Sequence, residues 1–197
     1  MLGQGHSRWE CYTVSMAQPS VVYRFKIELS DADRNVYQTL EFRAARHPSE
    51  TETLFAARVV AYCLNAQEDL EIMPGISSPD DPALRRLAPT GSVVLWVDVG
   101  MPDARRLHKA SKLGAEVRVY LHKEPFHYLK DLEGERIHRK DQIRIFSFRQ
   151  GFLEAMGRDF ERDHSASCVV TGGTLFWDQK GVTHESEIYE HRLSAEG

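Results

Sequence analysis

Residues 93–122 constrain the fold most, because two strand-like runs stand on either side of a helical segment. Residues 93–99 form an apolar run, residues 103–112 have helical periodicity, and residues 116–122 form a second strand-like run. A strand, a helix and a strand joined by short connections form a β-α-β unit, whose parallel strands are linked by a right-handed crossover. The sequence therefore predicts an α/β domain built on a mixed β-sheet.

The segments on either side of this unit add further strands and helices. Alternating apolar and polar residues predict an N-terminal hairpin with strands at 21–29 and 36–45. Ser49 and Glu52 have the spacing of a capping box, which predicts a helix over residues 48–67. The expected elements after it are a loop-rich region at 69–90, a strand at 142–148, a helix at 151–163 and a hairpin at 167–177.

The composition is that of one compact domain. A chain of 197 residues with 42% hydrophobic content can bury one core, and residues 16–197 are predicted to form it. Residues 1–15 are expected to be an unstructured leader or an over-extended start. They lack the apolar core of a signal peptide, and no apolar run is long enough to cross a bilayer, which predicts a cytoplasmic protein without membrane contact. Cys11, Cys63 and Cys168 lack metal-type spacing and are expected to be free thiols.

Asp98 is the first candidate for chemistry, because it stands inside the apolar run of residues 93–99. A carboxylate in such a strand is costly to bury unless it is paired, hydrogen-bonded or bound to a metal. The following helix folds back along the strand, so its first turns are expected near Asp98. Lys109 lies on the basic face of that helix and could reach a phosphate near Asp98. A basic helix face that only contacts solvent is an equally common alternative.

Three more acidic residues extend the candidate cluster, namely Glu50, Asp80 and Asp81. On the predicted helix Glu50 continues the apolar stripe of Leu54 and Ala57, while its ordinary interpretation is a first-turn acid that complements the helix dipole. Asp80 and Asp81, within SPDDP, have a turn or helix cap as their ordinary interpretation. Two or three carboxylates beside a lysine would suit Mg²⁺ or Mn²⁺ with a bound phosphate.

Four motifs give the chain a family resemblance. They are RHPSE at 46–50, DDP at 80–82, LWVDVGMPDARRLHKAS at 95–111 and EVRVY at 116–120. In order and spacing, residues 21–177 resemble the YaeQ family of bacterial proteins. That family is similar to the restriction-endonuclease-like, or PD-(D/E)xK, fold, whose members commonly cut nucleic acids with Mg²⁺. The resemblance implies a restriction-endonuclease-like core to which the N-terminal hairpin is added.

The same resemblance assigns roles to individual residues. Glu50 would be the acid of the first helix, Asp80 or Asp81 the acid of the PD position, and Asp98 the acid of the (D/E)xK strand. Gly100 stands where the superfamily has a lysine, so a catalytic lysine would come from the next helix. The lysine candidates are Lys109 and then Lys112, the metal ligands are Glu50, Asp81 and Asp98, and the phosphate contacts are Arg46, His47 and Arg105.

Two functions follow as expectations. The first is a nuclease or other phosphodiesterase that uses Mg²⁺ or Mn²⁺ and acts on nucleic acid. The alternative, favoured by Gly100, is a non-catalytic binding or regulatory module on the same scaffold. A net charge of -4 excludes a uniformly basic surface, so contact with nucleic acid would need a local basic cluster such as residues 136–144. The oligomeric state stays open.

Overall fold

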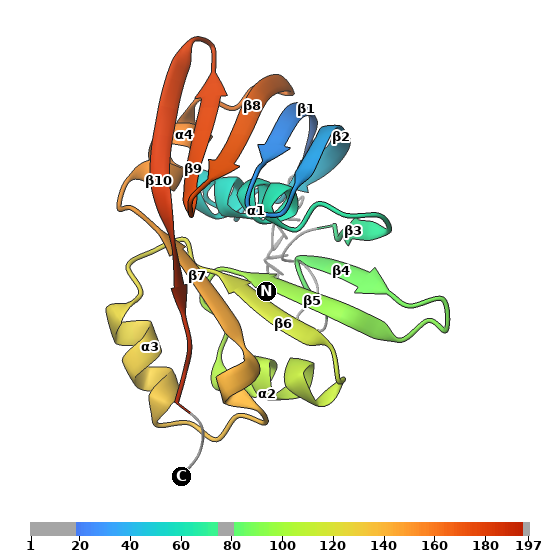
Figure 1. The fold of residues 1–197 in the computed structure, drawn as a ribbon, viewed down its shortest axis with the longest axis vertical. Helices are drawn as coiled ribbons and strands as arrows, with labels where there is room; N and C mark the ends of the chain where they lie inside the picture. The colour runs from blue at the N-terminus through green and yellow to red at the C-terminus, as the bar shows by residue number, and fades with distance from the viewer. Residues whose placement is uncertain (1–18, 75–80, 195–197) are drawn as a thin grey trace, which may run out of the picture.

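A ten-stranded mixed sheet with helices on both faces forms the protein (Figure 1). The computed structural model describes residues 19–74 and 81–194. The strands are β1 (Val21–Asp31), β2 (Val36–Arg46), β3 (Leu70–Ile72), β4 (Leu84–Leu87), β5 (Val93–Val99), β6 (Glu116–Tyr120), β7 (Arg144–Phe148), β8 (Asp163–Thr171), β9 (Thr174–Gln179) and β10 (Val182–His191). The helices of the described residues are α1 (Glu52–Leu64), α2 (Ala104–Lys112), α3 (Phe126–Glu133) and α4 (Phe152–Arg158), with a 3-10 turn at Lys140–Gln142. The predicted single α/β domain with a mixed sheet is confirmed.

The β-α-β unit has the predicted topology. β5 and β6 pair in parallel, with Val97 opposite Arg118, and α2 connects them. β6 continues in parallel to β7, so the carboxyl ends of three neighbouring strands meet at one edge of the sheet. In α/β sheets this edge is where ligands usually bind.

The sheet order is β2-β1-β8-β9-β10-β7-β6-β5-β4-β3, and β10 joins its two halves. The first part of β10 pairs with β9, and its last residues, from Ile188 to His191, pair with β7. Figure 1 shows β10 running along both halves, with α1 between the strands above it and those below it. The predicted hairpins β1–β2 and β8–β9 are confirmed, whereas β10 was missed.

The helix α1 begins later than the capping-box spacing predicts. Thr51 is the N-cap, and its hydroxyl accepts a hydrogen bond of 3.2 Å from the Leu54 amide. Ser49 instead makes a 2.6 Å hydrogen bond with the His47 ring, so it is not available to cap the helix. Two expectations are therefore wrong: the helix starts at Glu52 rather than near residue 48, and Glu50 precedes it.

The two faces of the half-sheet that contains β5, β6 and β7 pack against separate hydrophobic cores. Leu95 and Val97 pack in the cluster that surrounds α1, while Trp96 belongs to the cluster under α2 and α3 with Leu107 and Val119. This follows the alternation of side chains along a strand. Cys63 and Cys168 are buried free thiols, as expected, and Cys11 lies outside the described residues.

Other boundaries differ from the predictions. The helix α3 was missed because it lies in a charged stretch of the sequence, residues 124–141; its buried residues are Tyr128 and Leu132. The helix α4 ends at Arg158, earlier than predicted, and the short strands β3 and β4 lie in the region expected to be rich in loops. The prediction for residues 1–15 lies outside the described residues. None of the described helices is long and apolar enough to span a bilayer.

Candidate functional site

A cavity of about 280 Å³ lies at the carboxyl ends of β5 and β6. The start of α1, the loop after β5 and the first turn of α2 enclose it. The residues that line it are Glu50, Leu54, Arg58, Asp81, Pro82, Ala83, Asp98, Val99, Gly100, Met101, Pro102, Arg106 and His122. Three predicted acids, Glu50, Asp81 and Asp98, therefore share one cavity.

Glu50 is a buried acid, with 1% of its surface exposed. Its Oε2 atom accepts a 2.8 Å hydrogen bond from Nη2 of Arg58 and a longer one, 3.4 Å, from the His47 amide. Its Oε1 atom is buried and has no hydrogen-bond partner among the described residues. Burial raises the pKa of Glu50, and the nearby Arg58 opposes that rise. The Oε1 atom is therefore an acceptor without a donor within residues 19–74 and 81–194.

Arg58 is buried on α1 and crosslinks three segments. Besides Glu50, its guanidinium donates to the carbonyl oxygens of Ala45 at 2.6 Å and Met73 at 3.2 Å. The side chain is 2% exposed, and among the residues that the structure describes its ion pair is with Glu50. Such a pair is costly to break, because the remaining charge stays buried.

Asp98 is also buried, at 2% exposure, and it is held by α2. Both of its oxygens accept from Arg106, Oδ1 from Nη2 at 2.6 Å and Oδ2 from Nε at 2.9 Å. Oδ2 also accepts from the Trp96 indole at 2.9 Å. The side chain of Asp103 caps α2 by accepting from the Arg106 amide, which fixes the first turn of the helix beside the strand end.

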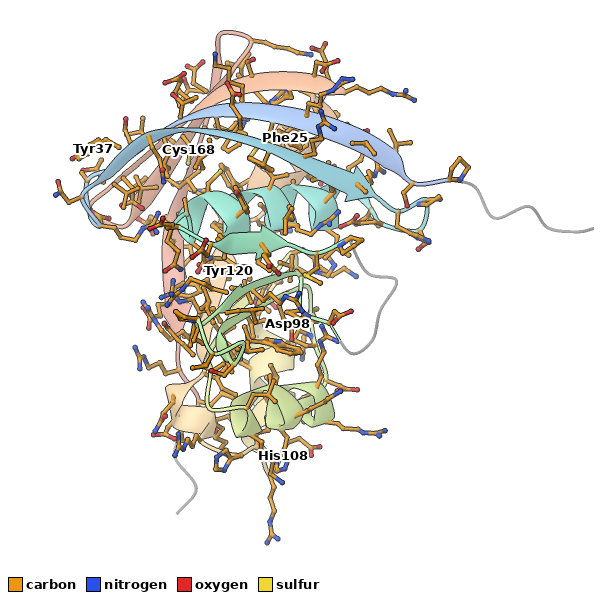
Figure 2. The ribbon with its side chains drawn as sticks, turned by 90° about the vertical axis from the view of Figure 1, so that its right-hand side faces the viewer. Phe25, Tyr37, Asp98, His108, Tyr120 and Cys168 are labelled. Atoms are coloured by element: carbon orange, nitrogen blue, oxygen red, sulfur yellow. The ribbon has the colours of Figure 1, made fainter. Side chains whose placement is uncertain are left out.

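The two buried acids approach the cavity from opposite faces of the sheet. Asp98 shares the α2 face with Trp96, whereas Glu50 is bonded to Arg58 on α1. In Figure 2 Asp98 lies between α1 above it and α2 below it. Within the described ranges, no group of three His, Cys, Asp or Glu side chains could hold a metal ion. Glu50 and Asp98 therefore face each other across one cavity but do not form a preorganised metal-binding site.

The charges that line the cavity do not cancel. Three carboxylates, those of Glu50, Asp81 and Asp98, face the guanidinium groups of Arg58 and Arg106. Burial lowers the pKa of His122, and Lys123 beside it lowers that pKa further, so the ring is neutral at pH 7. Its Nδ1 atom is buried without a hydrogen-bond partner among the described residues. By formal charge the three carboxylates outnumber the two guanidinium groups. Three buried atoms of the lining residues lack a hydrogen-bond partner among the described residues, namely Glu50 Oε1, Arg58 Nε and His122 Nδ1.

The remaining predicted residues do not line the cavity. Arg46 donates to the Glu50 carbonyl at 3.1 Å and His47 donates its amide to the Glu50 carboxylate, so both shape the turn around that acid. Arg105, Lys109 and Lys112 are exposed on α2. Asp80 lies outside the described residues, while the main-chain carbonyl of its neighbour Asp81 accepts a 2.6 Å hydrogen bond from Arg106. The basic residues 136–141 line a separate cavity that contains none of these acids.

Three residues of the cavity escaped the sequence analysis: Arg58, Arg106 and His122. Arg58 interrupts an apolar run of α1, so the argument that singled out Asp98 applies to it equally. Arg106 lies one helical turn after its cap Asp103, closer to Asp98 than the lysines that were preferred. His122 lies two residues after the end of β6, at the same sheet edge as Asp98, because β5 and β6 pair in parallel.

Gly100 has a backbone that disfavours any side chain. Its φ angle is +109°, and a Cβ atom there would lie 3.3 Å from Cδ1 of Leu54. We expect Gly100→Ala to lower the free energy of unfolding by about 1–3 kcal/mol, measured by urea denaturation. Gly134→Ala is the control, because its φ angle is -75° and its Cβ would lie at an ordinary contact distance, 3.7 Å, from the Asp131 carbonyl oxygen. Equal losses in the two variants would contradict this explanation for the absence of a lysine at position 100.

Comparison with known proteins identifies the family. The model of the family described as YaeQ protein matches residues 16–188. The uncharacterized protein YaeQ of Escherichia coli (strain K12) is 32% identical over 105 residues, which are 53% of this chain and 58% of that protein, so the match spans little more than half of either. The crystal structure of YaeQ protein from Pseudomonas syringae has a TM-score of 0.79 and 30% identity, and covers 91% of this chain and 99% of its own. For YaeQ protein from Xanthomonas axonopodis pv. citri the TM-score is 0.75, the identity 24% and the coverage 89% and 99%. As its motifs predicted, this chain belongs to the YaeQ family.

Proposed function

We propose that the cavity is a phosphodiesterase site that works with Mg²⁺ or Mn²⁺ on nucleic acid. The observation that carries the proposal is the convergence of Glu50, Asp81 and Asp98 on one cavity at the carboxyl ends of β5 and β6. The proposal includes a restriction-endonuclease-like core, in which β5 and the segments before α1 and β4 provide the acids, and α1 and α2 provide the cations. It rests on the family resemblance for the reaction class and on the cavity for the residues.

The donor set suits a divalent cation that binds together with substrate. Mg²⁺ in such sites is usually held by one or two carboxylates together with water and substrate phosphate, rather than by a complete protein cage. The unpartnered Oε1 atom of Glu50 and the negative charge of the cavity favour a cation. Glu50 and Asp98 would hold it, and Asp81 would add a third carboxylate. When bound, the ion would activate a water molecule and polarise the phosphate.

Arg106 has the second role in this proposal. It occupies both oxygens of Asp98 with short hydrogen bonds, and a guanidinium binds phosphate with the same bidentate geometry. An incoming phosphate would compete with Asp98 for Arg106, and the released carboxylate oxygen would become available to a cation. The proposal therefore predicts that cation and substrate bind cooperatively. In this proposal Arg106 takes the role that the family resemblance assigned to Lys109.

The neutral ring of His122 is the proposed proton acceptor of the site. Its buried Nδ1 atom has no hydrogen-bond donor among the described residues, so it can accept a proton from a water molecule or a substrate hydroxyl in the cavity. A neutral imidazole is the form that can act as a base. This assigns His122 the acceptor role and Arg106 the stabilisation of phosphate charge.

One observation favours the non-catalytic alternative. Both oxygens of Asp98 are already engaged by Arg106, and the described residues contain no ready group of three metal ligands. If Arg106 never leaves Asp98, the cavity is a rigid polar pocket that recognises a partner without hydrolysis. The two functions differ in their dependence on a metal ion.

A hydrolysis assay decides between them. We expect the purified protein to cleave bis(4-nitrophenyl) phosphate and fluorescently labelled DNA or RNA with Mg²⁺ or Mn²⁺, and to stop when EDTA is added. Asp98→Asn and Glu50→Gln should lose this activity, while Lys109→Ala should keep it.

Asp178→Asn on β9 is the control, since that acid lies on another part of the sheet. Thermal melting of each variant separates lost chemistry from lost fold. Equal rates in the wild type and in Asp98→Asn would rule out the phosphodiesterase.

A further inference from the structure

A second cavity, of about 430 Å³, adjoins the first. The two share His122, which lines both. The first cavity lies at the carboxyl ends of β5 and β6, and the second at those of β6 and β7, because Lys123 follows β6 and Arg149 follows β7. Since β5, β6 and β7 are parallel neighbours, the cavities form a row along one edge of the sheet.

The second cavity offers positive charge to a ligand. Lys123 lines it and makes no ion pair that the structure records within residues 19–74 and 81–194. Arg149 lines it as well, and its bond with Glu185 is long, at 3.5 Å, between side chains that are each 55% exposed. Such a surface pair is weak and easily exchanged for a phosphate.

The acids of the second cavity are already engaged. Both oxygens of Glu124 accept from the Phe126 amide at the start of α3, at 3.0 and 3.1 Å. Glu154 pairs with Arg158 one turn further along α4, at 2.9 Å, in a pair as exposed as that of Arg149 with Glu185. Lys123, which is exposed, is therefore the charge best placed to meet a ligand in this cavity.

An aromatic ring completes the second cavity. Phe148, the last residue of β7, is half-buried and lines the cavity. Its ring packs on Phe152 at 5.8 Å and stacks with Tyr120 at 6.4 Å between centroids. A supported aromatic ring beside two cations is the combination that binds single-stranded nucleic acid, where phosphates meet the cations and unpaired bases stack on the ring.

We propose that the second cavity is a subsite for the nucleotide next to the scissile phosphate of a single-stranded nucleic acid. Lys123 and Arg149 bind its phosphate, and its base stacks on Phe148. His122 lies at the boundary between the two cavities. A duplex keeps its bases stacked and paired, so the subsite selects single strands. This inference rests on the proposed function, because the first cavity provides the scissile position.

Two substrates of different length test the subsite. Bis(4-nitrophenyl) phosphate reaches the first cavity alone, whereas a labelled eight-nucleotide oligothymidylate extends into the second. At pH 8, where the His122 ring is neutral with or without Lys123, we expect kcat/KM of Lys123→Gln/Arg149→Gln for the oligonucleotide to fall about tenfold near physiological salt, while that for the small ester stays unchanged. The slope of log kcat/KM against log salt should become shallower by about 1.4, which corresponds to two lost phosphate contacts on a single strand. The wild type should cleave the single strand in preference to the same sequence in a duplex.

Lys180→Gln/Arg192→Gln is the matched control, because it removes the same charge from residues that line neither cavity. An equal loss on both substrates, an equal loss in the control, or equal cleavage of duplex and single strand would overturn the subsite. If the wild type cleaves neither substrate, the phosphodiesterase proposal fails. The subsite is then judged by the anisotropy of the labelled oligonucleotide, whose Kd must rise about tenfold in Lys123→Gln/Arg149→Gln. An unchanged Kd overturns it.

Discussion

Arg58→Ala should lower the free energy of unfolding by about 3–5 kcal/mol, because it leaves the carboxylate of Glu50 buried without its cation. The side chains of this pair are 2% and 0% exposed, and their contact is 2.8 Å long. The carbonyl oxygens of Ala45 and Met73 lose their donor at the same time. Urea denaturation at pH 7 measures the loss.

The loss should depend on pH in a defined direction. Burial already raises the pKa of Glu50 above its usual 4.5, and removal of Arg58 raises it further. The folded state then binds a proton more tightly than the unfolded chain, so stability falls as the pH rises through the raised pKa. The variant should therefore recover part of its stability when the pH is lowered from 7 towards 5.

Two further variants make this test sharper. Glu50→Gln/Arg58→Met should be more stable than Arg58→Ala, because it leaves no unpaired charge in the core. Arg158→Ala, which breaks an exposed pair with Glu154, should change the stability by no more than about 0.5 kcal/mol. A loss below about 1 kcal/mol in Arg58→Ala would contradict the account of this pair.

Arg106→Ala should destabilise the protein in EDTA and make it responsive to Mn²⁺. Asp98 is 2% exposed and would keep the Trp96 indole as its hydrogen-bond donor, so we expect a loss of about 2–4 kcal/mol. The freed carboxylate can then bind a cation, and a concentration of Mn²⁺ at 100 times its Kd would return about 2.7 kcal/mol. Thermal melting with and without Mn²⁺ measures both effects.

The same experiment separates the two candidate functions. Without substrate the wild type should respond less to Mn²⁺ than the variant, since Arg106 covers Asp98. Asp98→Asn/Arg106→Ala is the control and should show no gain from Mn²⁺, because the charged ligand is gone. If Arg106→Ala also fails to respond, Asp98 is not a metal ligand and the non-catalytic module is the better description.

The sequence predicted the parts of the fold that depend on local patterns. Strands β1, β2, β5, β6 and β8 follow alternating or apolar runs, and Gly172 and Gly173 form the predicted turn with positive φ angles. The strand β10 was missed, because its polar sequence is strand-forming only through pairing with β9 and β7. The start of α1 was also mispredicted, because both Ser49 and Thr51 are good N-cap residues. Thr51 caps the helix, while Ser49 bonds to the His47 ring.

The acids of the candidate site were predictable, but their partners were not. Asp98 stood out because a lone carboxylate in an apolar run needs compensation, and the structure provides it from Arg106 and Trp96. Lys109 was preferred over Arg106 because spacing along α2 does not say which cation fits the strand end. Glu50 was expected on a helix and lies before one, yet it reaches the same cavity. His122 was missed although the predicted parallel pairing of residues 93–99 and 116–122 already placed it at the same sheet edge as Asp98.

The parallel pairing of β1 with β8 has a consequence for synthesis on the ribosome. The amide of Gly172, after β8, donates to the carboxylate of Asp33, which lies 139 residues earlier. The N-terminal hairpin therefore emerges long before its neighbour and waits with one open edge, where nascent chains are prone to associate. Arg24, Lys26 and Glu28 place exposed charges along that edge strand, which keeps the waiting hairpin soluble until translation reaches β8.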